Sequence, residues 1–132
     1  ILLQLAMSVA IESIKISQQS RDQLIRLKRL TGIDQWNVLC RWAFCLSLSE
    51  KTTPPNIKIP ADSSVEMNWR TFGGEYADVY LALLIERNAR EGGERTKEDL
   101  LRCLRAHITR GIGYLTARRE VKDIAGLVGL VS

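Results

Sequence analysis

Apolar and polar residues alternate in an early stretch of the chain and then switch to helical spacing. Ile14 and Ile16 are separated by polar residues, which is the pattern of a strand with one buried face. Leucines then recur at positions 24, 27 and 30, with charged residues opposite them, as in an amphipathic helix. The sequence therefore predicts a short strand and then a helix, with Ser17 or Ser20 as the helix N-cap.

A turn and a second, more apolar helix are predicted next. Gly32 is suited to ending the first helix, because glycine adopts the left-handed backbone conformation easily, and Asp34 is suited to capping the second. Residues 36–48 are nearly all apolar, and a helix that is apolar on all sides is normally buried on all sides. One short domain rarely supplies that much cover, so we predict a subunit interface on this helix. The predicted interface residues are Trp36, Leu39, Trp42 and Phe44.

The rest of the chain reads as a loop followed by helices. Residues 50–64 hold three prolines and several hydroxyl residues and predict a loop, and residues 65–72 predict at most a short strand. Residues 75–90 predict a helix. Its expected apolar face comprises Tyr76, Val79, Tyr80, Leu83 and Leu84. This order of strand, helix, turn and helix, extended by further helices, predicts a mostly α fold with a small β element.

The last long helix is predicted to begin at Thr96, with Asp99 completing a capping box. Its apolar face runs through Gly111, where glycine lowers helix propensity by roughly 1 kcal/mol. Close packing against another helix is the expected compensation at that position. Residues 121–131 predict a short terminal helix that frays.

Composition fits one mildly basic domain. The 132 residues are 45% hydrophobic and carry a net charge of +4. The charge is uneven: residues 1–53 and 94–132 each carry +3, whereas residues 54–93 carry −2. Three cysteines do not make a disulfide framework, which favours a reducing, cytoplasmic setting, and no stretch is apolar enough for a membrane span. We expect residues 1–6, before Met7, to be a non-native or disordered extension and residues 7–132 to form a single domain.

Four stretches together resemble one protein family. They are Ile-Lys-Ile-Ser (14–17), Leu-Lys-Arg-Leu-Thr-Gly-Ile (27–33), Asn-Val-Leu-Cys-Arg-Trp-Ala-Phe-Cys-Leu-Ser-Leu (37–48) and Arg-Gly-Ile-Gly-Tyr-Leu (110–115). The chain resembles the DNA sulfur-modification protein E family, DndE, from about Met7 to the C-terminus. The resemblance implies an accessory subunit of bacterial DNA phosphorothioation, a restriction-modification system in which sulfur replaces a non-bridging phosphate oxygen. It also implies a ribbon-helix-helix-like N-terminal half and a DNA-binding homo-oligomer, expected to be a tetramer, that prefers nicked duplex.

Two groups of residues are candidates for DNA contact. Lys15 lies on the polar face of the strand beside Ser13 and Ser17, the face that ribbon-helix-helix proteins insert into the major groove. The first helix adds a basic set suited to phosphate, in which Asp22 is spaced to pair with Arg26. The predicted DNA-binding residues are Lys15, Ser17, Arg21, Arg26, Lys28 and Arg29. The alternative is an ordinary solvated strand and helix face. Asp34 disfavours a phosphate at the start of the second helix.

Other residues suggest chemistry that we weigh less heavily. Trp36 and Trp42 have the rings for base stacking, but their apolar neighbours favour core or interface. Cys40 and Cys45 are candidates for passing sulfur from one thiol to another, yet buried cysteine behaves as a small hydrophobe. The cysteine spacing does not fit a zinc site, and His107 is the sole histidine. For a C-terminal arginine set, interface or solvent is the expected setting. That set is Arg102, Arg105, Arg110, Arg118 and Arg119.

The sequence thus predicts no catalytic, cofactor-binding or metal-binding residue. The preferred function is an accessory DNA-binding subunit that contacts intact or nicked duplex mainly through phosphates. Two alternatives stay open: a structural adaptor that holds the other subunits of the sulfur-modification complex, and a DNA-nicking enzyme. The predicted partners are DNA, further copies of the chain and those other subunits, without a membrane.

Overall fold

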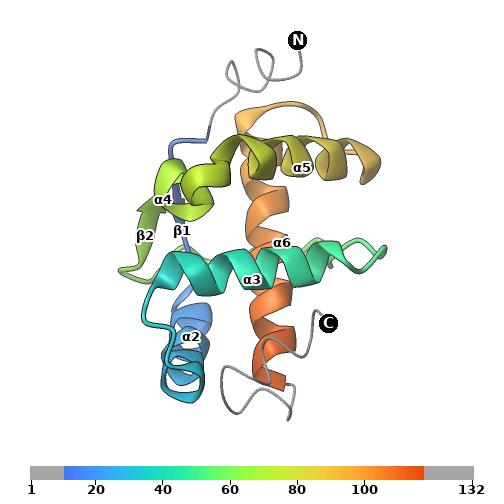
Figure 1. Ribbon diagram of the computed structural model, residues 1–132. Coiled ribbons are helices and arrows are strands. Elements are labelled where there is room, and N and C mark those ends of the chain that lie inside the picture. Colours follow the sequence, from blue (N-terminus) through green and yellow to red (C-terminus); the bar gives the residue numbers. More distant parts are fainter. Residues whose placement is uncertain (1–10, 118–132) are drawn as a thin grey trace.

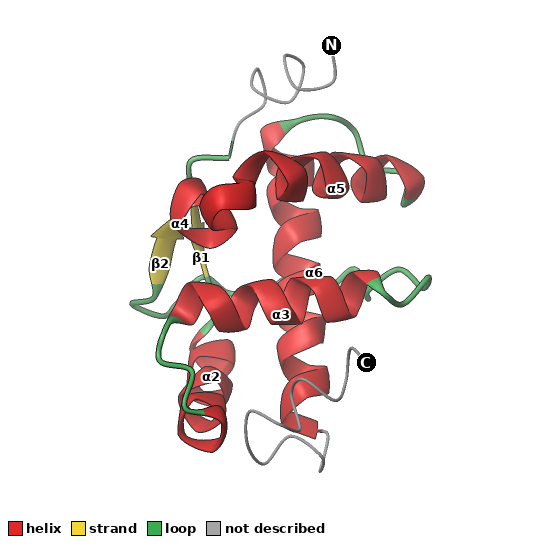
Figure 2. Cartoon of the chain, in the orientation of Figure 1, coloured by secondary structure: helices red, strands yellow, loops and turns green. Residues whose placement is uncertain are grey.

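The computed structural model describes residues 11–117, and helices dominate it (Figures 1 and 2). The strand and first helix form where the sequence predicts them, as β1 (Ser13–Lys15) and α2 (Gln18–Thr31). Ser17 is the N-cap of α2, because its Oγ accepts a hydrogen bond from the backbone N–H of Ser20 at 3.1 Å. Gly32 ends the helix with φ of 75°, which confirms the predicted stop.

A two-stranded antiparallel sheet lies beside the helices. β2 (Glu66–Asn68) pairs with β1, and Ile14 faces Met67 across the ladder with both side chains buried. The short strand predicted within residues 65–72 is therefore present. Since β1 finds its partner in the same chain, one edge of β1 is already occupied without a second subunit.

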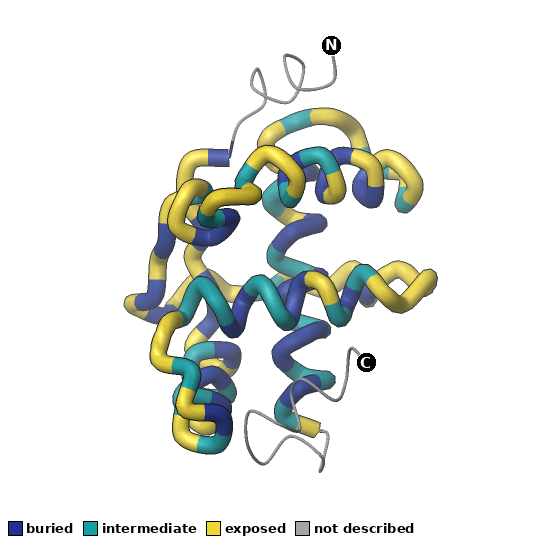
Figure 3. Tube along the Cα trace, viewed as in Figure 1, coloured by how far each residue is buried: buried dark blue, intermediate teal, exposed yellow. Residues whose placement is uncertain are grey.

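The apolar second helix, α3 (Trp36–Leu48), crosses α6 (Lys97–Ala117), and the two make the most extensive helix–helix contact (Figure 1). Leu39 and Phe44 are completely buried at this crossing. Both side chains are already covered within the single chain, with Phe44 packed against the rings of Phe72, Tyr80 and His107, so they belong to its core. Figure 3 shows α3 partly buried rather than buried all round.

The predicted cap of α3 is also wrong. Asp34 is exposed, and Gln35 occupies the N-cap position without a side-chain hydrogen bond to the helix. The helix begins later than expected, so the Asp34 carboxylate is one residue too early to accept from the free N–H groups.

A short helix, α4 (Trp69–Gly73), and a 3-10 turn, η1 (Gly74–Tyr76), lead into α5 (Ala77–Arg90). The helix is as predicted, and its buried face is predicted in part, since Leu84 is buried and Tyr80 packs against the core. The buried apolar side chains are Leu81, Leu84 and Ile85, whereas Tyr76, Val79 and Leu83 are 60%, 54% and 42% exposed. The apolar residues of this helix cover more than one face, and packing against α4 and α6 decides which of them are buried.

The start and the buried face of α6 agree with prediction. Thr96 Oγ1 accepts from the N–H of Asp99 at 3.2 Å, which is the first half of the predicted capping box. The second half differs, because the Asp99 carboxylate accepts from the N–H of Glu94 at 2.7 Å instead of from that of Thr96. A Cβ at Gly111 would lie only 1.8 Å from the Ala43 carbonyl oxygen of α3, which confirms the predicted close helix packing. Leu101 is partly buried, and the other apolar side chains on this face of α6 are buried: Leu100, Leu104, Ile108, Ile112 and Leu115.

The loop predicted within residues 50–64 holds no helix or strand. The terminal helix predicted at residues 121–131 and the expected N-terminal extension lie outside the described residues. Among the helices of residues 11–117, none has the length and apolar character needed to cross a membrane.

Candidate nucleic-acid interface

The outward face of the β1–β2 ribbon carries one lysine and one opposing carboxylate. Lys15 is exposed and lies in register with Glu66 of β2. Glu66 also accepts a hydrogen bond from Ser13 Oγ at 3.0 Å. The ribbon face therefore presents Lys15 as predicted, but its positive charge is offset by the strand beside it.

Ser17, by contrast, is only 6% exposed and its hydroxyl is engaged as the cap of α2. Its prediction as a DNA contact is wrong, because the side chain turns back onto the backbone of its own helix. A serine before a helix can act as its N-cap or as a DNA contact, and both roles were predicted for Ser17.

The outer face of α2 carries two exposed arginines. Arg26 and Arg29 form no ion pair or hydrogen bond within residues 11–117. The predicted pair between Asp22 and Arg26 is not made, since Asp22 lies 3.8 Å from Arg21 and accepts from Gln18 Nε2 at 3.0 Å. Two guanidinium groups are thus left facing solvent on this helix.

Lys28 is engaged with an aromatic ring. Its Nζ lies 3.6 Å from the ring centroid of Trp36, which is a cation–π contact between α2 and α3. Trp36 and Trp42 are both half-buried and pack against the core, so the structure favours the packing role over base stacking.

The arginines of α6 do not share one role. Arg102 is exposed and pairs with Asp99 at 2.8 Å. Arg105 donates to the carbonyl oxygens of Lys15, Ile59 and Pro60 at 2.8 to 3.0 Å, and burial lowers the pKa of its guanidinium. Arg110 donates to Ser47 and Thr52. Arg105 and Arg110 are held by oxygen atoms within the chain, a role that the sequence did not predict. Arg118 and Arg119 lie outside the described residues.

The cysteines occupy different settings. Cys40 is fully buried, and burial raises the pKa of its thiol to about 12, which fits a small hydrophobe. Cys45 is exposed beside Tyr80, in an open hollow of about 370 Å³ between α3 and α5, and partial burial raises the pKa of this thiol too. Neither thiol has the lowered pKa that a sulfur relay needs.

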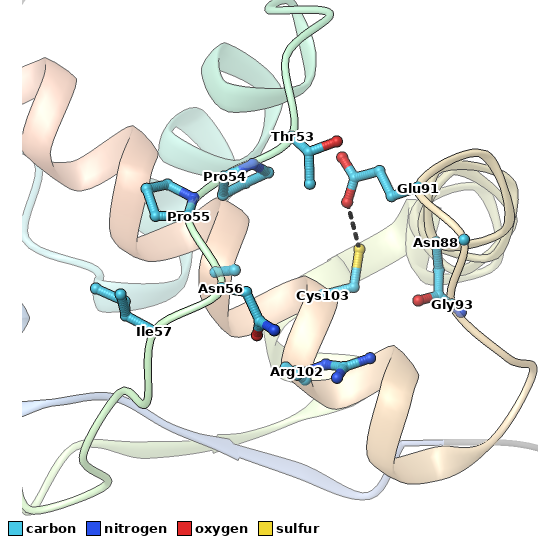
Figure 4. Close-up of a pocket in the computed structure, with 12 residues that line it drawn as sticks. Thr53, Pro54, Pro55, Asn56, Ile57, Asn88, Glu91, Gly93, Arg102 and Cys103 are labelled. Carbon is cyan, nitrogen blue, oxygen red and sulfur yellow. Dashed lines mark hydrogen bonds between the residues drawn. The ribbon is translucent and has the colours of Figure 1, made fainter.

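A third cysteine belongs to a cluster that sequence reasoning missed. Cys103, His107 and Glu91 meet where α5 ends against α6, and Figure 4 shows Cys103 and Glu91 at the adjacent pocket. Burial lowers the pKa of His107, and Glu91 opposes that shift. The sequence does contain one sign of this cluster: Cys103 and His107 are four residues apart, which places them on the same face of a helix.

The family model described as DNA sulphur modification protein DndE matches residues 13–123. The chain belongs to the DndE family. Members of the DndE family are involved in DNA phosphorothioation, so the predicted family and process are confirmed.

Two solved DndE structures resemble the chain. The crystal structure of DndE from Escherichia coli B7A, involved in DNA phosphorothioation modification, has a TM-score of 0.70 and 25% identity and covers 81% of this chain and 98% of that chain. A glycine-to-lysine mutant of DndE, involved in DNA phosphorothioation, has a TM-score of 0.63 and 23% identity with the same coverage and supports the fold alone. No curated protein matches the sequence.

Proposed function

We propose that the chain is an accessory subunit of DNA phosphorothioation that binds intact or nicked duplex through phosphate contacts as a homo-oligomer. The observation that carries the DNA-binding proposal is the outer face of α2, where Arg26 and Arg29 are exposed and have no acidic partner within residues 11–117. A guanidinium group without an acidic partner can bind phosphate through two parallel N–H···O hydrogen bonds, a bidentate geometry.

Phosphate contact is favoured over base reading because of what the exposed ribbon face carries. That face presents Ser13, Lys15, Glu66 and Asn68, and the Asn68 side chain is occupied as the cap of α4. Phosphate contacts position a protein but carry no sequence information. We therefore expect affinity that depends strongly on salt and weakly on sequence, with duplex flexibility at a nick as the source of any preference.

Changing Arg26 and Arg29 together to alanine is expected to weaken binding about equally on two unrelated duplexes. Each lost phosphate contact lowers the slope of log affinity against log salt by about 1. The slope is to be measured by fluorescence anisotropy at several salt concentrations, on intact and nicked duplex.

The matched control changes Arg90 and Arg102 to alanine. Both are exposed and ion-paired on their own helices, so net charge falls by the same amount. An affinity that ignores salt, or an equal loss in the control, contradicts the proposal. Absence of DNA binding at low salt favours the adaptor instead, and nicking of supercoiled plasmid with Mg²⁺ favours the enzyme.

The homo-oligomer is proposed on a surface shared by α3 and α5. Val79 and Leu83 are exposed on α5, and Tyr76, at the end of η1, is exposed just before them. Tyr80 of α5 joins Trp42 of α3 in lining the hollow between the two helices. This surface differs from the one predicted from the sequence. Of the four predicted residues, Trp42 lines the hollow, whereas Leu39 and Phe44 lie in the core. Trp36 remains a proposed interface residue. Several subunits on one duplex raise effective affinity when each makes few contacts.

Leu83→Glu is expected to dissociate the oligomer and leave the fold intact, because Leu83 is 42% exposed in the single chain. Analytical ultracentrifugation should report a mass above 14.9 kDa for the unchanged protein and 14.9 kDa for the variant. Ile57→Glu, at a loop residue that is 64% exposed, is the matched control and should stay oligomeric. Phe44→Glu should unfold the chain, because it places an unpaired charge in the core. A monomeric unchanged protein contradicts this proposal.

A further inference from the structure

A cluster of sulfur, nitrogen and oxygen donors lies at the end of α5, away from the residues proposed to bind DNA. Cys103 and His107 project from one face of α6, and Glu91 is the C-cap residue of α5. One donor atom from each lies within 4.8 Å of the other two. His107 Nε2 is 2.9 Å from one Glu91 carboxylate oxygen, and Cys103 Sγ is 3.6 Å from the other.

We propose that Glu91, Cys103 and His107 bind one zinc ion. Thiolate, imidazole and carboxylate are the three zinc ligands that proteins use, and tetrahedral zinc takes them at about 2.0 to 2.3 Å. Those bond lengths imply separations of about 3.4 Å between ligand atoms in a tetrahedron. The observed separations bracket that value, so the three donors lie close to the spacing that a tetrahedral ion needs. The donors favour zinc over Mg²⁺ or Ca²⁺, which select oxygen ligands.

The groups behind the cluster fit a metal-binding histidine. His107 Nδ1 lies 2.8 Å from Ser47 Oγ, and Ser47 Oγ accepts from Arg110 Nε at 2.8 Å. Without an ion, the Nε2 proton of His107 donates to Glu91 and the Ser47 hydroxyl donates to Nδ1. With the ion, Nε2 binds the metal and Nδ1–H donates to Ser47 Oγ, which takes the place of the carboxylate, carbonyl or water that usually accepts from a zinc-bound imidazole.

A neighbouring arginine shares the Glu91 carboxylate with the proposed ion. Arg87 Nε donates to Glu91 at 2.9 Å, and its remaining N–H groups donate to carbonyl oxygens that include Leu48 and Thr52. The Glu91 carboxylate and the Cys103 thiolate carry two negative charges against the two of zinc, and Arg87 leaves the group with one net positive charge. The Cys103 thiol must release its proton to bind, and this proton leaves to solvent.

The cluster opens onto a cavity of about 190 Å³ that supplies a route for the ion and a fourth position for water. Glu91 and Cys103 line it together with Asn88, Arg102 and the loop that includes Asn56 (Figure 4). Three protein ligands beside an open position are typical of zinc sites that bind a water or a further ligand.

Cobalt titration of the full chain, without a histidine tag, tests the site. We expect one equivalent of Co²⁺ to give a thiolate charge-transfer band and four-coordinate visible bands, both removed by Zn²⁺. Cys103→Ser should abolish the charge-transfer band, whereas Cys45→Ser, at the exposed cysteine, should retain it. Ser47→Ala should keep the band but weaken affinity about 10- to 100-fold, as loss of an outer partner does.

A second measurement needs no variant. Zinc should slow alkylation of Cys103 and leave alkylation of Cys45 unchanged, as mapped by peptide mass spectrometry. The proposal is overturned if the folded protein gives no charge-transfer band, if the band survives Cys103→Ser, or if zinc does not protect Cys103. These outcomes are independent of DNA binding.

Discussion

Replacing Gly111 by alanine is expected to destabilise the protein severely, although the same change elsewhere in a helix is favourable. A Cβ at Gly111 would lie 1.8 Å from the carbonyl oxygen and 2.7 Å from the Cα of Ala43. These are backbone atoms of α3, so no side chain can rotate away, and α3 and α6 must separate. Overpacking typically costs about 1–3 kcal/mol, and we place this change at or beyond the upper end because the largest helix contact is disrupted.

Gly113→Ala is the matched control on the same helix. A Cβ at Gly113 meets no atom within 4 Å, so this variant should gain up to about 1 kcal/mol of helix propensity. Urea denaturation followed by circular dichroism measures the free energy of unfolding of both variants. Equal stability of the two variants would show that α3 and α6 do not cross at Gly111.

Arg87→Ala is expected to lower the free energy of unfolding by about 3–5 kcal/mol, the range for breaking a buried ion pair. Arg87 is 4% exposed and joins three parts of the chain: it pairs with Glu91 at 2.9 Å and donates to Leu48 at 2.9 Å and to Glu50. Its removal leaves the Glu91 carboxylate without its cation and frees the loop after α3.

Arg90→Ala, one turn away, provides the control. Arg90 also pairs with a glutamate at i, i+4, but both side chains are more than half exposed, so the loss should stay below about 0.5 kcal/mol. Thermal and urea denaturation of both variants measure the contrast. A similar, small loss for Arg87→Ala would mean that its carbonyl contacts do not hold the loop.

Local rules determined the positions of the secondary-structure elements. Ser17, Gly32 and Thr96 mark helix ends because capping depends on a few neighbouring residues and their backbone angles. Gly111 indicated a helix crossing because its position on an apolar face has no local benefit. The exposed positions of Arg26 and Arg29 also followed from the helical period. Asp34 failed as a cap because a shift of one residue in a helix start lies beyond what local pattern resolves.

Tertiary structure decided which of several locally equivalent choices was realised. The sequence offered a wide apolar face on α5, and packing against the rest of the chain buried Leu84 while leaving Leu83 at the surface. The sequence does not show which arginines are bound within the chain. Folding brought carbonyl oxygens of a distant loop to Arg105 and Arg110, whereas Arg26 received none. Glu91 reaches His107 only because α5 ends against α6. Periodicity reports which residues share a face, whereas only packing across the chain selects the partner of that face.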